Sequence, residues 1–298
     1  MHGAEEFARD SREEEARAMN EGKASRTAMM VAYMRAVADA GVTHVRDFHD
    51  PTAHVYLNAK WSGRLAKIVQ QFRSGRETMS LAVARASADM MALRTKAIDA
   101  AVCDAVRAGT SQLVILGAGL DGRAWRMKEL TGVRVFEVDH PATQAFKRAH
   151  LDRLPAAIAE VSFVPTNFER DALNDVLARA GHDATRPTCW IWEGVVMYLT
   201  HQTMLTTLAN ISSRSATGST LIVNYHTSMR SLLFRVFLRF LGEPVKSAAQ
   251  PAEMAADLDA AGFDVVEDAG IAELASRFAG GAEQPAGKVM RIVVAQRR

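Results

Sequence analysis

The sequence predicts an α/β protein with a seven-stranded, mostly parallel sheet that follows a helical N-terminal segment. Its 298 residues, 48% of them hydrophobic, are enough for one large domain with a single core. Roughly the first hundred residues show no alternation of apolar and polar positions, which argues against strands there. From Gln112 onward, short β-branched runs are separated by segments of helical length, a pattern typical of parallel sheets.

The N-terminal segment is expected to be helical. An alanine-rich series with interspersed charges runs from Ser25 to Ala40, a turn is expected at Asp50-Pro51, and a further helix runs from about Met79 to Arg107. We therefore expect residues 1–108 to form a helical extension or cap on a domain made by residues 109–298.

The strands are expected after this segment, with the last two close together. They are predicted at 112–116, 133–138, 160–164, 188–193, 219–224, 263–266 and 288–294. A helical insertion at about 227–260 separates the fifth strand from the sixth and contains a densely apolar stretch at 232–241. A helix there must bury its apolar face as a core helix, as a lid over a hydrophobic ligand, or in a dimer. Membrane contact is the least favoured alternative, because only Arg235 and Arg239 supply basic charge.

Composition favours a cytoplasmic protein that binds a small molecule, as a monomer or a homodimer. With 36 basic and 34 acidic residues scattered along the chain, the net charge of +2 gives no reason to expect a nucleic-acid partner. Cys103 and Cys189 match no metal-ligand spacing and are expected to be buried free thiols in a reducing compartment. No signal peptide, membrane span or metal site is predicted.

The segment from 112 to 139 has the outline of a nucleotide-binding βαβ unit. Gly117 and Gly119 let the backbone turn and approach a ligand, and Asp139, twenty residues beyond Gly119, can accept hydrogen bonds from ribose hydroxyls. The string from Gly117 to Gly122 also fits the GxGxxG pattern of NAD-binding folds. The loop alone therefore leaves open a dinucleotide, S-adenosylmethionine (SAM) or a simple turn.

Residues at the ends of later strands favour SAM. The third strand ends in Thr166-Asn167-Phe168, which offers an amide and an aromatic ring to an adenine. The fourth ends at Glu193, a carboxylate that suits the ammonium and sulfonium of SAM but would repel a pyrophosphate.

Three motifs then occur in order at the ends of three strands. They are Leu116-Gly-Ala-Gly-Leu-Asp-Gly-Arg-Ala-Trp-Arg-Met127, Phe136-Glu-Val-Asp-His-Pro141 and Trp192-Glu-Gly-Val-Val-Met-Tyr-Leu199. Together they resemble the leucine carboxyl methyltransferase family, in particular its bacterial branch of polyketide-type O-methyltransferases, from about residue 20 to the C-terminus. The resemblance implies a class I methyltransferase (Rossmann-like) fold that uses SAM.

The resemblance also implies roles for individual residues. Arg94 would bind the methionine carboxylate of SAM, Glu193 its amino group and Asp139 its ribose. Many relatives carry Asp where this chain has Asn167, whose amide can still accept from the adenine amino group. The implied cofactor-binding residues are Arg94, Gly117, Ala118, Gly119, Asp139, His140, Asn167, Phe168 and Glu193.

The implied reaction is methyl transfer to a small carboxylic or phenolic acceptor. A carboxylate needs no general base, whereas a hydroxyl does, and His226 lies nearest the expected acceptor side among the candidates His140, His201 and His226. Tyr198 and Tyr225 are candidates for steering the acceptor by hydrogen bonds. Two other functions stay open: an NAD-type oxidoreductase, because of GxGxxG, and a non-catalytic SAM-binding protein, because of Asn167.

Overall fold

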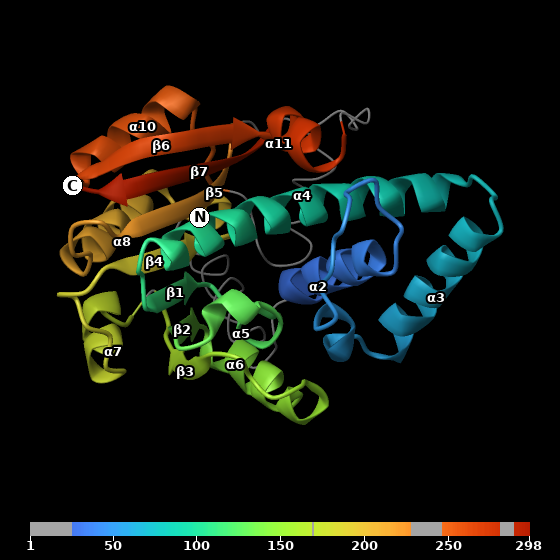
Figure 1. Cartoon of the computed structure of the whole chain (residues 1–298), viewed down its shortest axis with the longest axis horizontal. Helices are drawn as coiled ribbons and strands as arrows, with labels where there is room; N and C mark the ends of the chain where they lie inside the picture. Colours follow the sequence, from blue (N-terminus) through green and yellow to red (C-terminus); the bar gives the residue numbers. More distant parts are fainter. Residues whose placement is uncertain (1–25, 169, 228–245, 281–288) are drawn as a thin grey trace, which may run out of the picture.

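The computed structural model describes residues 26–168, 170–227, 246–280 and 289–298, which form a seven-stranded sheet with helices on both faces (Figure 1). The strands are β1 (Gln112–Leu116), β2 (Arg134–Asp139), β3 (Glu160–Pro165), β4 (Thr188–Trp192), β5 (Thr220–His226), β6 (Phe263–Gly270) and β7 (Met290–Arg297). Their spatial order is β3-β2-β1-β4-β5-β7-β6.

The sheet is mostly parallel, as predicted. All neighbours among β1 to β5 pair in parallel, and β7 runs antiparallel to both β5 and β6. Each predicted strand corresponds to an observed one. The last two are longer than predicted because β6 and β7 pair with each other over nearly their whole lengths.

The N-terminal segment is helical, as expected. It contains α2 (Arg26–Asp39), a short 3-10 helix at Ala53–Tyr56, α3 (Ala59–Arg73) and the 29-residue α4 (Met79–Arg107). Thr78 caps α4 by accepting the Leu81 N–H. The prediction did not include α3. This helix lies at the outer end of the cap (Figure 1) and buries only Ile68, so its sequence carries a weak core signal.

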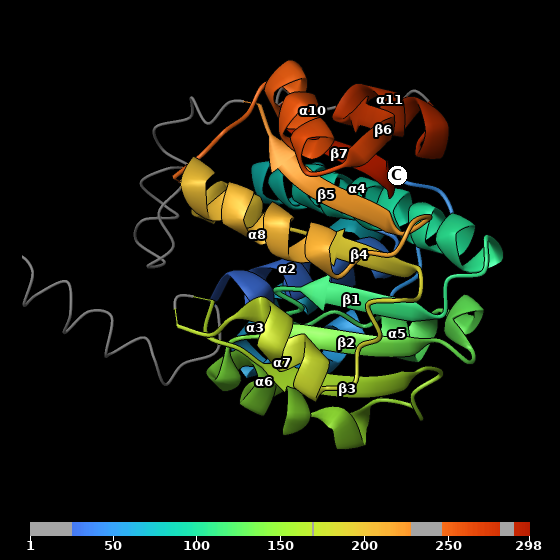
Figure 2. The same cartoon turned by 90° about the vertical axis from the view of Figure 1, so that its left-hand side faces the viewer.

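Two helical layers cover the sheet. The other helices are α5 (Arg123–Arg126), α6 (Pro141–Arg148), α7 (Leu173–Arg179), α8 (His201–Ser213), α10 (Pro251–Ala260) and α11 (Ile271–Phe278), with short 3-10 turns at Lys128–Leu130, Leu151–Arg153 and Val196–Tyr198. Along β1, Leu113 and Ile115 belong to the core shared with α2, α4 and α11, whereas Val114 and Leu116 belong to the core shared with α7, α8 and α10. Figure 2 shows α7 and α8 on one face and α4 on the other.

Several sequence expectations concern this architecture. The boundary expected near residue 108 falls between α4 and β1, yet α2 and α4 share one core with the sheet, so two separate domains remain a prediction. The apolar stretch at 232–241 lies outside the described residues.

Cys189 is buried, but Cys103 is only half-buried, so the expectation of two buried thiols is wrong for Cys103, which lies on a partly exposed turn of α4. In the described ranges, no helix combines the length and apolarity needed to cross a membrane.

Arg35, half of a buried ion pair within the cap, also joins the cap to the loop after β1. Arg35 on α2 donates from Nη1 to Asp50 Oδ2 at 2.7 Å and from Nη2 to the Leu120 carbonyl at 2.6 Å. Asp50 is fully buried and also accepts from the Thr52 hydroxyl at 2.6 Å. Burial alone would raise the pKa of Asp50, but Arg35 and Arg126 outweigh it and hold the pKa below its usual value.

We expect Asp50→Asn to lower the free energy of unfolding by about 3 to 5 kcal/mol at pH 7, because it leaves Arg35 buried without a counter-charge. Since the pKa of Asp50 is depressed in the folded state, its stabilisation is present at neutral pH and is lost as the pH falls below about 4. Urea unfolding should therefore show a difference between parent and variant that shrinks in acid. The control is Asp104→Asn in an exposed pair with Arg107, expected to cost at most about 1 kcal/mol. Equal stability of parent and Asp50→Asn at pH 7 would contradict this account.

Candidate functional site

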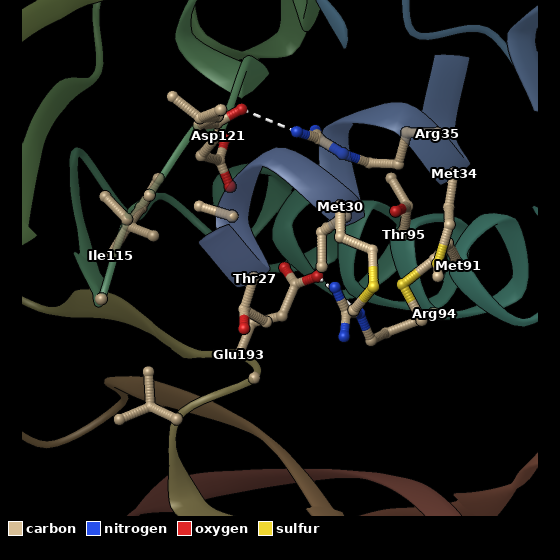
Figure 3. A pocket seen from close by; sticks show the side chains of 18 of the residues that line it. Thr27, Met30, Met34, Arg35, Met91, Arg94, Thr95, Ile115, Asp121 and Glu193 are labelled. Atoms are coloured by element: carbon tan, nitrogen blue, oxygen red, sulfur yellow. Dashed lines mark hydrogen bonds and ion pairs between the residues drawn. The ribbon is translucent and has the colours of Figure 1, made fainter. Parts of the chain in front are cut away.

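A cavity of about 310 Å³ lies at the carboxyl edge of the parallel strands, between the sheet and the cap helices α2 and α4 (Figure 3). Its walls come from α2, α4, the loops after β1 and β4, the end of β2, and single residues of β5 and β7. Ligand sites of α/β sheets are commonly found at this edge, and the volume is at the lower end of the range of about 300–1,000 Å³ for small-molecule pockets.

Strand register brings the predicted cofactor residues together. Leu116, the last residue of β1, lies opposite Val138 of β2 and Trp192 of β4. The next residues on these strands, Gly117, Asp139 and Glu193, therefore emerge at one level of the sheet edge. All three line the cavity, with Ala118, Gly119 and Arg94.

The glycine loop needs its first glycine for two reasons. Gly117 has φ +67°, a left-handed conformation, and a Cβ there would lie 2.4 Å from Cγ2 of Val195 in the loop after β4. The Gly117 and Ala118 N–H groups donate to the Val138 carbonyl at 2.8 and 3.1 Å, which fixes the start of the loop against β2. The loop thus passes very close to the end of β4.

Asp139 connects this loop to the start of α6. Its carboxylate accepts the backbone N–H of Gly119 and, at 2.6 Å, that of His140. The N-cap of α6 is His140, whose Nδ1 accepts the Ala142 N–H at 3.3 Å, so Asp139 does not serve as that cap. Burial raises the pKa of Asp139 above its usual value, although the two backbone donors act in the opposite direction.

Arg94 and Glu193, the residues expected to bind the two charges of the amino-acid part of SAM, both line the cavity, and their charged ends meet there (Figure 3). Arg94 Nε lies 2.7 Å from Glu193 Oε1, but its N–H is not aimed at that oxygen, so the contact is an ion pair without hydrogen-bond geometry. Arg123 donates from Nη1 to Glu193 Oε2 at 3.0 Å. Although burial opposes ionisation, Arg94 and Arg123 hold the pKa of Glu193 below its usual value.

Unsatisfied donors gather around the same cavity. Among the described residues, several buried side-chain atoms without a hydrogen-bond partner belong to residues that line it: Thr27 Oγ1, Arg35 Nε, Arg94 Nε, Thr95 Oγ1 and His226 Nδ1. Buried polar groups are normally satisfied, and hydroxyls and guanidinium groups seek acceptors such as a carboxylate. The cavity therefore offers donors for a ligand carboxylate next to Glu193, which can accept from a ligand cation.

His226 is neutral in this setting. Burial, together with the charge of Arg94, lowers the pKa of its imidazole to about 4. It lines the cavity with Tyr198, the other candidate on the acceptor side.

Four of the predicted residues do not line the cavity. Tyr225 lies in the core on the opposite face of the sheet, where its hydroxyl donates to Asp268 Oδ2 at 2.6 Å. Asn167 and Phe168 follow the edge strand β3; the Asn167 N–H donates to Asp171 Oδ2 at 2.7 Å, and Phe168 is exposed. His140 caps α6 beside Asp139.

The lining residues missed by sequence reasoning include Thr27, Arg35 and Thr95, and two further groups stand out. One is Arg123, which is buried. The available sequence signal was a charged residue two positions after Asp121 in an otherwise apolar loop. The other is a set of methionines: Met30, Met34, Met90, Met91, Met197 and Met290. The four on α2 and α4 have a helical spacing that looks like that of ordinary core positions. Within the described ranges, no group of three or more His, Cys, Asp or Glu side chains is arranged to hold a metal ion.

We expect Gly117→Ala to abolish cofactor binding, because the added Cβ must displace Val195 and the loop. The matched control is Gly132→Ala, which has φ +78° but no atom within 4 Å of the new Cβ. Both variants should lose about 1 to 2 kcal/mol of stability from the left-handed backbone, measured by urea unfolding. Titration with S-adenosylhomocysteine should show lost binding for Gly117→Ala alone, and equal binding by both variants would refute the close contact.

Comparison with known proteins places the chain in a family. The family model described as leucine carboxyl methyltransferase matches residues 28–212. A protein of Mycolicibacterium smegmatis assigned as an S-adenosyl-L-methionine-dependent methyltransferase is 35% identical over 214 residues, 70% of this chain and 67% of that protein. A protein of Mycobacterium ulcerans with the same assignment is 44% identical over 134 residues, 45% of this chain and only 43% of that protein.

The fold has solved counterparts. The crystal structure of a protein from Thermobifida fusca assigned as a methyltransferase has a TM-score of 0.52 and 15% sequence identity, covering 89% of this chain and 94% of that one. This likeness shows the class I methyltransferase fold, and the sequence matches favour SAM over the dinucleotide that the glycine loop left open. The chain therefore belongs to the leucine carboxyl methyltransferase family of SAM-dependent methyltransferases.

Proposed function

We propose that the protein is an O-methyltransferase that transfers the methyl group of SAM to the carboxylate of a small hydrophobic metabolite. The observation that carries the choice of a carboxylate is His226, a neutral imidazole with a pKa of about 4 that lines the cavity. Such a group is a poor base for an alcohol or phenol, whereas a carboxylate is already ionised and needs no base. The family description, leucine carboxyl methyltransferase, agrees with a carboxylate acceptor.

The chain's own residues would hold SAM by its two ends. Arg94 would bind the methionine carboxylate and Glu193 the ammonium, while Gly117, Ala118 and Gly119 pass beneath this part and Asp139 accepts from the ribose hydroxyls. Asn167 and Phe168, at the end of β3, would receive the adenine with His140 nearby. When bound, SAM supplies a methyl group on a positively charged sulfur.

The acceptor would lie against an apolar, adaptable wall. Six methionines line the cavity, and methionine side chains fill irregular spaces because they are unbranched and polarizable. Met197 and Tyr198 follow β4, and Met290 begins β7, so this wall continues to the His226 side of the cavity. These side chains favour a hydrophobic body for the acceptor.

Catalysis would rest on alignment in a water-poor cavity. Charge is cancelled when an oxygen anion attacks a methyl group on a cationic sulfur, so the protein mainly has to hold the oxygen, carbon and sulfur in line, an effect worth roughly 7 to 11 kcal/mol. Neutral His226 and Tyr198 line the cavity and would donate hydrogen bonds to the acceptor oxygen that does not attack.

The alternative is a hydroxyl acceptor with His226 as general base, and one variant separates the two. For a carboxylate acceptor, His226→Ala should lower kcat/KM by less than about 10-fold, because only a hydrogen bond is lost. For a hydroxyl acceptor, the loss should be about 10² to 10⁴-fold. The measurement is S-adenosylhomocysteine release with panels of apolar carboxylic acids and phenols. His201→Ala, in an exposed pair with Asp257, is the control and should leave turnover unchanged. Turnover of phenols but no acid would contradict the carboxylate proposal.

The loss of cofactor affinity at low pH should reflect protonation of Asp139. Because burial raises the pKa of Asp139 while that of Glu193 is lowered, Asp139 is the first of the two to gain a proton as the pH falls. Protonation removes acceptor capacity for the ribose, so affinity for S-adenosylhomocysteine should begin to fall at a pH above the ordinary titration range of an aspartate. Calorimetric titration between pH 4 and 8 measures this.

Asp139→Asn is the control for this titration. It should bind more weakly at pH 7 and show no loss over the same acid range, because an amide does not titrate. A parent without affinity for S-adenosylhomocysteine at any pH would refute the assignment of the cavity to SAM. It would also remove the basis for a non-catalytic SAM-binding role.

A further inference from the structure

Two buried arginines and two partly buried carboxylates close a ring between the cap and the loops after β1 and β4. Arg94 on α4 contacts Glu193 after β4, at 2.7 Å. Glu193 accepts from Arg123 at 3.0 Å, and Arg123 Nε donates to Asp99 at 2.7 Å. Asp99 lies on α4, five residues after Arg94, so the first and last residues of the ring belong to the same helix.

Arg123 does not need Glu193 for its own compensation. Arg123 is 2% exposed, and its guanidinium lies among three carboxylates: Asp99, Asp121 and Glu193. Asp99 and Asp121 alone would satisfy a buried arginine, whose cost without a partner would be large. The contact between Arg123 and Glu193 therefore mainly fixes the orientation of the Glu193 carboxylate, which lines the cavity.

The two oxygens of Glu193 are divided between two arginines. Oε2 accepts from Arg123, and Oε1 faces Arg94 without hydrogen-bond geometry. A bound methionine group would bring a carboxylate to Arg94 and an ammonium to Glu193. Arg94 would then turn to its new partner, and Oε1 would accept from the ammonium, while Arg123 keeps Oε2 in place.

We propose that Arg123 is a positioning residue for the amino-acid end of SAM: it holds Glu193 so that one carboxylate oxygen always faces the cofactor ammonium. This inference rests on the proposed cofactor site and goes beyond it. Arg123 touches no reacting atom and acts through Glu193. Its effect is therefore confined to ligands that carry the amino-acid chain.

Two probes isolate that effect. S-adenosylhomocysteine carries the amino-acid chain, whereas 5′-methylthioadenosine has the same adenosine and a sulfur but lacks it. Arg123→Lys keeps the charge and loses the fork that spans Asp99 and Glu193. We expect this variant to lower the affinity for S-adenosylhomocysteine about 10- to 100-fold and to change the affinity for 5′-methylthioadenosine by less than about twofold. Arg123→Met should give a larger loss of the same selectivity.

The matched control is Arg126→Lys. Arg126 is on the same short helix, is buried, and donates to the same Asp99 at 2.7 and 3.0 Å, but no contact joins it to Glu193. It disturbs the same charge cluster and should leave the ratio of the two affinities unchanged. In a Glu193→Gln background, Arg123→Lys should have no further effect on S-adenosylhomocysteine, because the residue it acts through is already altered.

The outcomes separate the inference from the proposed function. If Arg123→Lys lowers the affinities for both probes by the same factor, Arg123 is a structural residue and the inference fails while the cofactor site stands. The same conclusion follows if the effects of Arg123→Lys and Glu193→Gln on S-adenosylhomocysteine affinity add up in the double variant. Unchanged affinity for S-adenosylhomocysteine in Arg123→Lys would overturn it as well. A parent that binds neither probe would overturn both. If Arg123→Met does not fold, as judged by its thermal unfolding, Arg123→Lys alone decides.

Discussion

Buried carboxylates that must be paired determine how the cap sits on the sheet. Asp99 of the cap is matched by Arg123 and Arg126 of α5, and Glu193 after β4 is matched by Arg94 of the cap. Asp50 of the cap lies 3.7 Å from Arg126, and an unpaired charge at this interface would cost several kcal/mol. Hydrophobic contacts between α4 and the sheet tolerate small shifts. The directional ion pairs do not, because a guanidinium must meet its carboxylate within hydrogen-bond distance. The position of α2 and α4, and with it the shape of the cavity, follows from this pairing.

The cap and the sheet edge supply different chemistry to the cavity. The sheet edge contributes the glycine loop, Asp139 and Glu193, where backbone and carboxylate oxygens suit a ribose and a cation. The cap contributes Arg94 and most of the methionines, so the charge that suits a carboxylate arrives together with apolar surface. Neither half would form the proposed site alone. The common core of α2, α4 and the sheet is therefore a requirement of function as well as of stability.

The sequence predicted what depends on local pattern and missed what depends on long-range geometry. Each strand could be located because runs of four to seven residues rich in β-branched side chains are bounded by turn residues. Tyr225 and His226 show the limit: both follow the fifth strand's apolar run, yet side chains alternate, and only the placement of Ile222 in the core shared with the cap tells that His226 faces the cavity. Arg123 was missed because its role depends on hydrogen bonds to Asp99 and Glu193, which are 24 and 70 residues away in the sequence. Charge partners at that separation leave no periodic signal.

The pairing of Arg94 with Glu193 also bears on which ligands the cavity would select. Each residue compensates the other within the protein, so a ligand that offered only a cation or only an anion would leave one buried charge without its partner. A zwitterion offers both and replaces one ion pair by two. Selection of the amino-acid end of SAM then needs no additional recognition group, because a ligand of either single charge is penalised by the same desolvation that makes the pair necessary. The Arg123 contact to Oε2 adds the geometric part of this selection, since it leaves Glu193 one oxygen, in one direction, for the ammonium.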